Sequence, residues 1–346
     1  MAPIGPRPPA IAIVTATYNR SRALACAIES ARRQSFADWE MIVVGDACTD
    51  DTAEMLERID DPRIRFLNLE QNCGEQAGPN NVGIAETTAP LIAFLNHDDV
   101  WLPNHLELCR EALIAQTADL VFGVMANLQP DTRLPLRFET LHLVLEGAFE
   151  GNRYSPGELD AGVVPASSWL VRREVLQRLG GWKLARDCYV EPSQDLLFRA
   201  WRAGYRLRAL NIVTTLVVAS GCRPGSYLHG QAVEQEWFLE RIGDAAFAAE
   251  LAALGVPSSS TELHLRPPSW VRKLAMGAAM LGLNPRELDF RFRRRLRRGE
   301  RIAGFRKTRG LVGAAPALRD VGATLRFDAV RRSCRIEIGA TIDFGA

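Results

Sequence analysis

The feature that most constrains the fold is an alternation of short apolar runs with amphipathic segments near the start of the chain. Apolar runs at residues 11–17, 41–44, 64–69 and 91–95, the first of them rich in β-branched residues, have the length of buried strands. Segments of helical periodicity lie between them, the last at residues 78–85. Strands that alternate with helices predict right-handed crossovers and a mostly parallel sheet covered on both faces. We therefore expect an α/β fold with a Rossmann-like, doubly wound sheet.

Composition narrows the class of protein. The chain has 346 residues, 47% of them hydrophobic, and a formal net charge of +1, so it can bury one large or two medium cores and has no overall field that favours nucleic acid. Its seven cysteines are scattered and never spaced as CxxC, which argues against a disulfide framework or a zinc site and predicts a reducing, cytoplasmic setting. The sequence offers neither a signal-peptide pattern nor an apolar run near the roughly 20 residues of a membrane span.

Polar residues follow three of the predicted strands, at the edge of the sheet where such folds bind ligands. They are Thr17, Tyr18 and Asn19 after the first strand, Gly45 and Asp46 after the second, and Asn96, His97, Asp98 and Asp99 after the fourth. We expect the three groups to meet. The sequence has no GxGxxG turn after the first strand and no Walker lysine loop, which disfavours a dinucleotide dehydrogenase and a P-loop enzyme.

The adjacent carboxylates Asp98 and Asp99 predict a cation site. Two neighbouring negative charges at a strand end repel each other, but a bound divalent cation that also contacts a pyrophosphate reverses the sign of this interaction. Mg²⁺ and Mn²⁺ prefer carboxylate oxygens and commonly bridge to substrate phosphates. The alternative is that the pair caps the helix expected near Pro103.

Six segments occur in a fixed order between residues 11 and 209. They are IAIVTATYNR, WEMIVVGDACTDDT, NCGEQAGPNNVGI, LIAFLNHDDVWLP, LGGW and EPSQDLLFRAWRAGY. Together they resemble the family 2 glycosyltransferases of the GT-A fold. The chain departs from the family pattern at Gly45 and Asn96, where an Asp is usual.

The resemblance implies a mixed, mostly parallel GT-A sheet and an inverting reaction. A sugar would pass from a nucleotide-diphosphate donor, with a UDP-sugar favoured, to a hydroxyl of a glycan or glycolipid, as in polysaccharide biosynthesis. It implies a divalent metal, Mn²⁺ or Mg²⁺, as Lewis acid for the leaving diphosphate. It places the general base at Asp195, which starts an amphipathic helix and could instead be a plain N-cap. Glu191 could assist the acceptor or have no function.

The resemblance also implies donor-binding residues. Asp46 would accept a hydrogen bond from the nucleobase, most often from uracil N3. Thr17 and Tyr18 would flank the ring as part of the Thr-Tyr-Asn signature that ends at Asn19, although Tyr18 could equally pack in the core. Asn80 and Asn81 would contact the diphosphate or hold a loop beside the metal.

The metal would rest on the acidic strand end. One of Asp98 and Asp99 would hold the cation and the other would contact the ribose or lie in the second coordination shell, with Asn96 as an uncharged oxygen donor beside them. His97 fills the variable position of the motif. His229 lies where some relatives have a late metal ligand, or it is a structural loop residue.

The expected domain order is a disordered tail, a transferase domain and a basic helical region. The tail covers residues 1–10, and the GT-A domain covers 11–225, with a nucleotide-binding half at 11–100 and an acceptor half at 101–225. The mainly helical region covers 226–346.

Two stretches of the last region have amphipathic patterns. Residues 231–254 predict one helix. Residues 286–309 carry eleven Arg or Lys against three acidic residues and predict a surface helix that contacts anionic lipid or a lipid-linked acceptor, at the inner face of the membrane. The alternative is a solvated helix that pairs with the domain's own acids. Nucleic-acid binding is disfavoured, and the sequence does not indicate an oligomeric state.

Two other functions fit parts of the pattern. A glycoside hydrolase could use Asp98 or Asp99 with Asp195 as its paired carboxylates, but this leaves the nucleotide-binding type of half unexplained. A degenerate GT-A fold that binds a nucleotide-sugar or glycan with little catalysis would follow if Gly45 and Asn96 have removed metal affinity.

Overall fold

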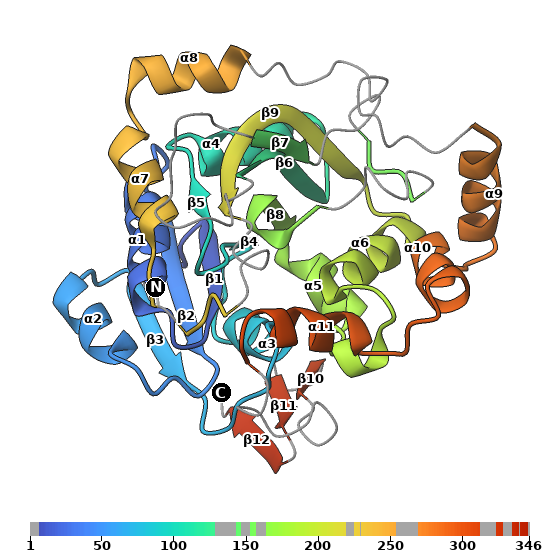
Figure 1. Cartoon of the computed structure of the whole chain (residues 1–346), viewed down its shortest axis with the longest axis horizontal. Helices are drawn as coiled ribbons and strands as arrows, with labels where there is room; N and C mark the ends of the chain where they lie inside the picture. Colours follow the sequence, from blue (N-terminus) through green and yellow to red (C-terminus); the bar gives the residue numbers. More distant parts are fainter. Residues whose placement is uncertain are drawn as a thin grey trace, which may run out of the picture.

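The structure is a computed structural model that describes residues 7–128, 153–156, 164–218, 225–228, 230–253 and 269–311, and the backbone of four further strands. Figure 1 shows an α/β molecule with helices on both faces of a central sheet. The first elements are β1 (Ile11–Thr17), α1 (Ser21–Arg32), β2 (Trp39–Gly45), α2 (Thr52–Ile59), β3 (Ile64–Asn68), α3 (Ala77–Ala85), β4 (Leu91–Phe94), β5 (Val100–Trp101) and α4 (His105–Ala115). These bounds confirm the strands predicted at residues 11–17, 41–44, 64–69 and 91–95 and the helix predicted at residues 78–85.

The central sheet is mixed, and most of its strands are parallel. Its later strands are β6 (Leu120–Leu128), β7 (Leu143–Glu146), β8 (Trp169–Arg172) and β9 (Leu207–Val218). In the described residues its order is β3-β2-β1-β4-β8-β6-β9-β5, with β7 paired to β6. Strands β8, β5 and β7 run opposite to the others. This agrees with the expected mixed, mostly parallel sheet, and it aligns the carboxyl ends of β1, β2 and β4.

Two apolar cores hold helices to the faces of the sheet. The alternation along β1 sends Ile11 and Ile13 to one face and Ala12 and Val14 to the other, and all four are buried. The first face packs against α1, α2 and α4, and the second against α3, α5 (Arg173–Leu179) and α6 (Pro192–Arg202). Full burial of one such aliphatic side chain stabilises the fold by about 1.5–3 kcal/mol. The well-packed sheet therefore holds the residues that follow its strands in fixed positions.

An aromatic cluster lies at the end of β4. The indoles of Trp169 and Trp182 are stacked, with centroids 5.6 Å apart and planes at 14°, and Phe94 meets both rings edge-on. The Asn81 side chain fixes Trp182 by accepting from its backbone N–H at 2.8 Å and donating to its carbonyl at 2.9 Å. The cluster therefore supports the chain two residues before Asn96.

The C-terminal region contains more breaks than its sequence pattern predicts. Its elements are α7 (Val233–Arg241), α8 (Ala245–Ala253), α9 (Ser269–Met280), α10 (Pro285–Leu288), a π-helical turn (Asp289–Arg293), α11 (Glu300–Thr308) and the strands β10 (Ala323–Phe327), β11 (Cys334–Ile338) and β12 (Ala340–Phe344). The prediction of one helix over 231–254 is wrong, because Gly243 has φ +118° between α7 and α8. The prediction of one helix over 286–309 is also wrong, because Arg295 and Gly299 have positive φ.

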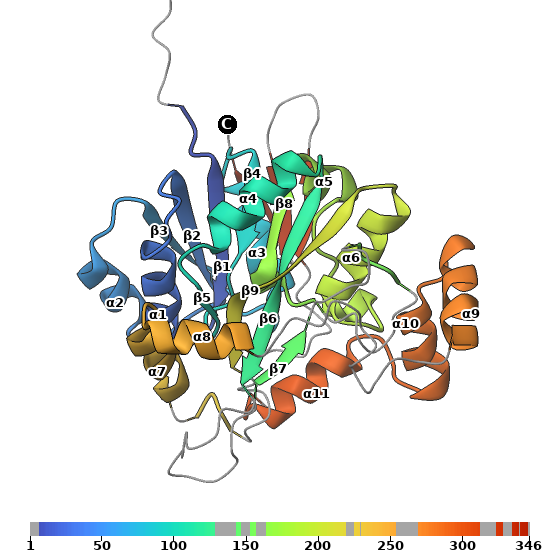
Figure 2. The same cartoon turned by 90° about the horizontal axis from the view of Figure 1, so that it is seen from above.

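The last three strands form a separate antiparallel sheet that the sequence pattern does not indicate. Figure 1 shows this sheet beside α3. In Figure 2, α9 and α10 lie apart from the central sheet, while α11 runs across its edge. Within the part of the chain that the structure describes, none of the helices is both long and apolar enough to cross a membrane.

Candidate active site

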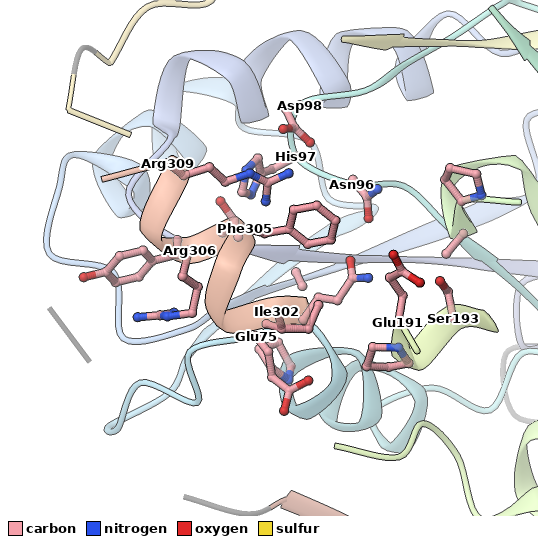
Figure 3. Close-up of a pocket in the computed structure, with 18 of the residues that line it drawn as sticks. Glu75, Asn96, His97, Asp98, Glu191, Ser193, Ile302, Phe305, Arg306 and Arg309 are labelled. Carbon is pink, nitrogen blue, oxygen red and sulfur yellow. The ribbon is translucent and has the colours of Figure 1, made fainter. Parts of the chain in front are cut away.

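A cavity of about 450 Å³ opens at the carboxyl ends of the parallel strands (Figure 3). Its floor consists of the chain after β1, β2 and β4, the start of α3 and the start of α6, and its roof is the inner side of α11. Thr17, Tyr18, Asp46, Asn96, Asp98 and Asp99 all line it. The three polar groups that follow β1, β2 and β4 therefore do meet in one place.

Asp46 is held by backbone donors at one end of the floor. Its Oδ1 accepts from the Cys73 N–H at 2.5 Å and its Oδ2 from the Gly74 N–H at 2.9 Å. Burial raises the pKa of this carboxyl to about 6, and the two backbone hydrogen bonds oppose that rise. A carboxylate that is fixed by its backbone neighbours and still faces the cavity can accept one more donor from a ligand.

The acidic strand end separates Asp98 from Asp99. The Asp99 Oδ2 accepts from the Ser167 Oγ at 2.5 Å and from the Asn96 Nδ2 at 3.0 Å. Burial, with the neighbouring Asp98 charge, raises the pKa of Asp99 to about 8. Asp99 therefore orients the amide of Asn96, whereas Asp98 turns toward the cavity (Figure 3).

These residues fit a divalent cation through their donor chemistry. The described residues contain no cluster of three or more His, Cys, Asp or Glu side chains that could enclose a metal. Mg²⁺ does not need such a cage, because it is commonly bound by one or two carboxylates together with substrate phosphates. Asp98 can provide such a carboxylate, next to the hydrogen-bonded side chains of Asp99 and Asn96.

The imidazole of His97 is neutral and buried beside Tyr227. Burial lowers its pKa to about 4, and its Nε2 lies 3.1 Å from the Tyr227 hydroxyl, whose ring it meets edge-on. This agrees with its expected place as the variable residue of the motif. His229 lies outside the described residues.

Asp195 does not line the cavity. It is buried on α6, where its Oδ2 accepts from the Arg199 Nε at 2.6 Å and its Oδ1 from the Lys183 Nζ at 3.1 Å. It is the fourth residue of the helix, so it is not the N-cap either. Both of its oxygens are engaged by cations, and the pair with Arg199 ties α6 to the turn at Gly181 through further Arg199 hydrogen bonds.

Glu191 is the carboxylate of this segment that lines the cavity. It is the N-cap of α6, but its side chain makes no capping hydrogen bond, and Pro192 at the first helical position has no N–H to satisfy. Its Oε1 accepts from the Arg301 Nε at 2.8 Å, while its buried Oε2 has no hydrogen-bond partner among the described residues. Figure 3 shows this side chain turned into the cavity. A buried carboxylate oxygen without a donor is costly unless a ligand completes it.

Three other predicted site residues do not line the cavity. Asn19, at φ 47°, accepts from the Thr49 N–H at 2.8 Å and so fastens the loop after β2. Asn81 holds Trp182, and Asn80 is buried beside it in α3. Asn19, Asn80 and Asn81 are therefore not among the residues that line the cavity.

A steric constraint explains why residue 45 is a glycine. A Cβ on Gly45 would lie 2.5 Å from the Asn68 Oδ1, which accepts the Cys48 N–H at 2.8 Å. The Asn68 Nδ2 in turn donates to the Cys48 carbonyl at 2.9 Å. Asn68 thus fills the space that a larger residue at position 45 would need.

Sequence reasoning missed several lining residues that come from distant segments. Glu75 accepts from the Ala185 N–H at 2.8 Å, and burial raises its pKa to about 8. Tyr227, the α11 residues Phe305 and Arg306, and Arg309 just after the helix also line the cavity. The one available signal was the spacing of the arginines in 301–309, which places them on one face of a helix.

Comparison with solved structures identifies the class of fold. Residues 1–349 of TarS from S. aureus, solved with UDP-GlcNAc, superpose with a TM-score of 0.51 at 14% sequence identity, covering 95% of this chain and 96% of that one. The arrangement is that of the GT-A glycosyltransferases, as the sequence resemblance implied.

Sequence comparison points to the same class of protein. The model of the family "Glycosyl transferase family 2" matches residues 12–180. An uncharacterized glycosyltransferase of Nostoc sp., alr2836, is 31% identical over 208 residues, which are 56% of this chain and 57% of that protein.

A second relative has a defined activity. The UDP-Glc:alpha-D-GlcNAc-diphosphoundecaprenol beta-1,3-glucosyltransferase WfgD of Escherichia coli is 29% identical over 113 residues, 33% of this chain and 44% of that protein. The chain spans about half the length of the curated relatives it matches.

Proposed function

We propose that this enzyme transfers a sugar from a nucleotide-diphosphate donor, favouring a UDP-sugar, to a hydroxyl of a glycan or lipid-linked acceptor, with inversion at the anomeric carbon. The observation that carries the proposal is the Glu191 Oε2, a buried carboxylate oxygen without a described hydrogen-bond partner, in the same cavity as Asp46, Tyr18 and Asp98. TarS solved with UDP-GlcNAc and the UDP-Glc named for WfgD support the choice of nucleotide.

The nucleoside would bind at the end of the floor formed by β1 and β2. The Tyr18 ring and Thr17 would flank the base, and the Asp46 carboxylate would accept its imino N–H. Asp46 is already fixed by two backbone donors, so it would lose little conformational entropy on binding.

Glu191 rather than Asp195 would be the general base. The Oε2 of Glu191 would take the proton of the acceptor hydroxyl as its oxygen attacks the anomeric carbon from the side opposite the diphosphate. A single displacement of this kind inverts the configuration. Asp195 is held by Arg199 and Lys183 and would keep α6, and with it Glu191, in position.

A divalent cation, Mn²⁺ or Mg²⁺, would be held by Asp98, with Asp99 in the second coordination shell. When bound, it supplies Lewis-acid stabilisation of the charge that grows on the leaving diphosphate. Asp99 and Asn96 would orient Asp98 through the hydrogen bond between their side chains and the turn that they form.

The test is a donor screen followed by a transfer assay. Thermal shift with UDP-, GDP- and dTDP-sugars, with Mn²⁺ or EDTA, should single out one nucleotide whose stabilising effect increases with metal. Release of the free nucleotide should then depend on an added glycan or lipid-linked acceptor, and the product should have inverted stereochemistry. Metal-independent binding without transfer would support a binding module instead. Acceptor hydrolysis without nucleotide would support a glycoside hydrolase.

We also propose that the C-terminal helices contact an anionic membrane surface from the cytoplasmic side. Trp270 and Leu274 are 64% and 66% exposed on α9, while the small residues Ala275 and Ala279 on its other side are buried. Residues 269–298 carry nine Arg or Lys and two acidic residues. Asp289 pairs with Arg293 and Arg294, so part of this charge is balanced within the protein, and the remainder complements anionic lipid.

Vesicle sedimentation tests this contact. The protein should bind vesicles that contain phosphatidylglycerol more strongly than pure phosphatidylcholine, and Trp270→Ser with Leu274→Ser should weaken the binding. Ile114→Ser, at an apolar side chain of α4 that is 54% exposed, is the matched control and should have no effect. Equal binding by all three proteins would exclude the α9 face as the contact.

A further inference from the structure

The helix α11 presents a positively charged face to the cavity. Its residues Ala303, Gly304, Lys307 and Thr308 are exposed, while Arg301, Ile302, Phe305, Arg306 and the following Arg309 are partly buried on the opposite side. All of the latter except Arg301 line the cavity. None of the nine residues of α11 is fully buried, so this face is not packed as a core face would be.

Each arginine of this face meets a different part of the floor. Arg301 bonds to Glu191 at 2.8 Å, and the Arg306 Nη1 donates to the Gly74 carbonyl at 2.5 Å, next to the backbone N–H that holds Asp46. Arg309 lies with its guanidinium carbon 6.0 Å from the centre of the Tyr227 ring and is close enough for its charge to act on Asp99. Arg306 therefore lies beside the backbone that holds Asp46, and Figure 3 shows Arg309 extending toward His97 and Asp98.

The charges of the floor alone would repel a diphosphate. Asp46, Glu75, Asp98, Asp99 and Glu191 all line the same cavity. Of these five carboxyl groups Glu191 is paired with Arg301, and the acidic character of the others does not favour a ligand that is itself an anion. In the described part of the lining, Arg306 and Arg309 are the side chains with a permanent positive charge.

We propose that Arg306 and Arg309 bind the diphosphate of the nucleotide-sugar donor and stabilise it as the leaving group. This deepens the proposed function and rests on it. A guanidinium is permanently charged and presents a planar fork of N–H donors that matches two phosphate oxygens. The bond between the anomeric carbon and the phosphate oxygen breaks with its electron pair going to that oxygen, and the two arginines neutralise the charge that develops there. The acceptor proton goes to the carboxylate base, so no proton is needed on the leaving group.

The alternative is that the two arginines only hold α11 on the floor. In that case the loss of either would loosen the helix and would weaken the binding of nucleoside and nucleoside diphosphate alike. A diphosphate contact predicts a different pattern, in which the affinity for uridine is unchanged and the affinity for uridine diphosphate falls.

Calorimetry with uridine and with UDP separates these two roles. Wild type should bind UDP at least tenfold more tightly than uridine, and part of this difference should persist in EDTA. The double variant Arg306→Gln, Arg309→Gln should lose at least tenfold in UDP affinity and keep its uridine affinity. Lys307→Gln, on the exposed side of the same helix, should match wild type in both measurements.

Two results would overturn the proposal. One is a double variant that binds UDP as tightly as wild type, and the other is an equal loss for uridine and UDP. A wild-type protein that binds neither UDP nor GDP, with or without Mn²⁺, would instead overturn the proposed donor class, so the two failures are distinguishable. Arg309→Lys refines the test, because it keeps the charge, removes the planar fork and should give an intermediate UDP affinity.

Discussion

The floor and the roof of the cavity carry opposite charges and are held in different ways. On the floor, Asp46 is fixed by backbone N–H groups, Asp99 by Ser167 and Asn96, and Glu75 by the Ala185 N–H. These donors lie in the loop before α3, in the turn after β4 and in two 3-10 turns, at residues 166–168 and 185–187. The roof, α11, has no fully buried residue and is joined to the floor largely by arginine contacts.

The difference indicates a division of roles between the two halves of the chain. The proposed nucleobase recognition and proton transfer require acidic groups in fixed positions, because both depend on geometry at the level of a hydrogen bond. The proposed diphosphate contact requires basic groups that admit the donor and then surround it, which a weakly buried helix can provide. Four experiments test this contrast between floor and roof.

The largest effect is expected at Glu191, the floor residue whose carboxylate accepts a hydrogen bond from Arg301. Glu191→Gln should lower kcat by about 10²–10⁴ with little change in donor affinity, because it removes the proton acceptor and keeps the shape of the side chain. Steady-state kinetics with a saturating donor would measure this.

The matched variant is Asp195→Asn. It should destabilise the protein by about 1–3 kcal/mol through the loss of its charged hydrogen bonds and should reduce kcat far less than Glu191→Gln. A collapse of turnover confined to Asp195→Asn would return the role of base to Asp195, as the sequence resemblance implies.

The second experiment compares the two adjacent aspartates. Asp98→Asn should remove the Mn²⁺-dependent part of UDP affinity, since it deletes the carboxylate that faces the cavity. Asp99→Asn should weaken metal binding by about 10–100-fold, as expected for a residue that orients its neighbours. UDP titrations with and without Mn²⁺ would measure both. Ser167→Ala, which removes one donor to Asp99, should have the smallest effect, and a larger loss at Asp99 than at Asp98 would reverse their assignments.

The third experiment tests how tightly the floor is packed. Gly45→Ala should cost about 1–3 kcal/mol in the free energy of unfolding, because the new methyl group displaces the Asn68 amide from the Cys48 backbone. Urea denaturation would measure the loss. Asn68→Ala should cost less when it is added to Gly45→Ala than when it is made alone, since it then removes the side chain with which the new methyl group clashes. Additive losses would show that the two residues do not compete for the same space.

The smallest effect concerns the pH dependence of stability. Burial raises the pKa of Glu75 from its ordinary value of 4.5 to about 8, so the folded protein keeps this proton over a range where the unfolded chain has lost it. Its contribution to stability is therefore full below pH 4.5 and declines as the pH rises toward 8. Glu75→Gln should have the Tm of wild type at pH 5 and a higher Tm at pH 8.5, by less than about 4 °C. The same difference at both pH values would contradict the assignment.

The part of the site that the sequence predicts is the part that strand ends determine. Thr17, Tyr18, Asp46 and Asp98 follow predicted parallel strands, and the sheet alone brings them to one edge. In the same way, the alternating pattern predicts the order of β1 to β4, because each strand carries its own local signal.

The rest depends on contacts between segments that lie far apart in the chain. The Asn81 side chain is hydrogen-bonded to the backbone of Trp182. The Arg199 side chain, which donates to Asp195, also donates to the Gly181 carbonyl. No local pattern shows that Asn81 has such a partner, whereas for Asp195 the arginine four residues later is a local signal of an ion pair. The C-terminal helices were predicted too long because left-handed residues such as Gly243 and Gly299 interrupt a continuous amphipathic pattern.

The stacked indoles of Trp169 and Trp182 give the protein an optical reporter of its own. Two parallel indole rings with centroids 5.6 Å apart couple their electronic transitions, so the pair should give a circular dichroism band whose sign and size depend on their mutual angle. Phe94 connects the pair to the acidic strand end two residues later. A cation or nucleotide that shifts this strand end should therefore change the spectrum of the unlabelled enzyme.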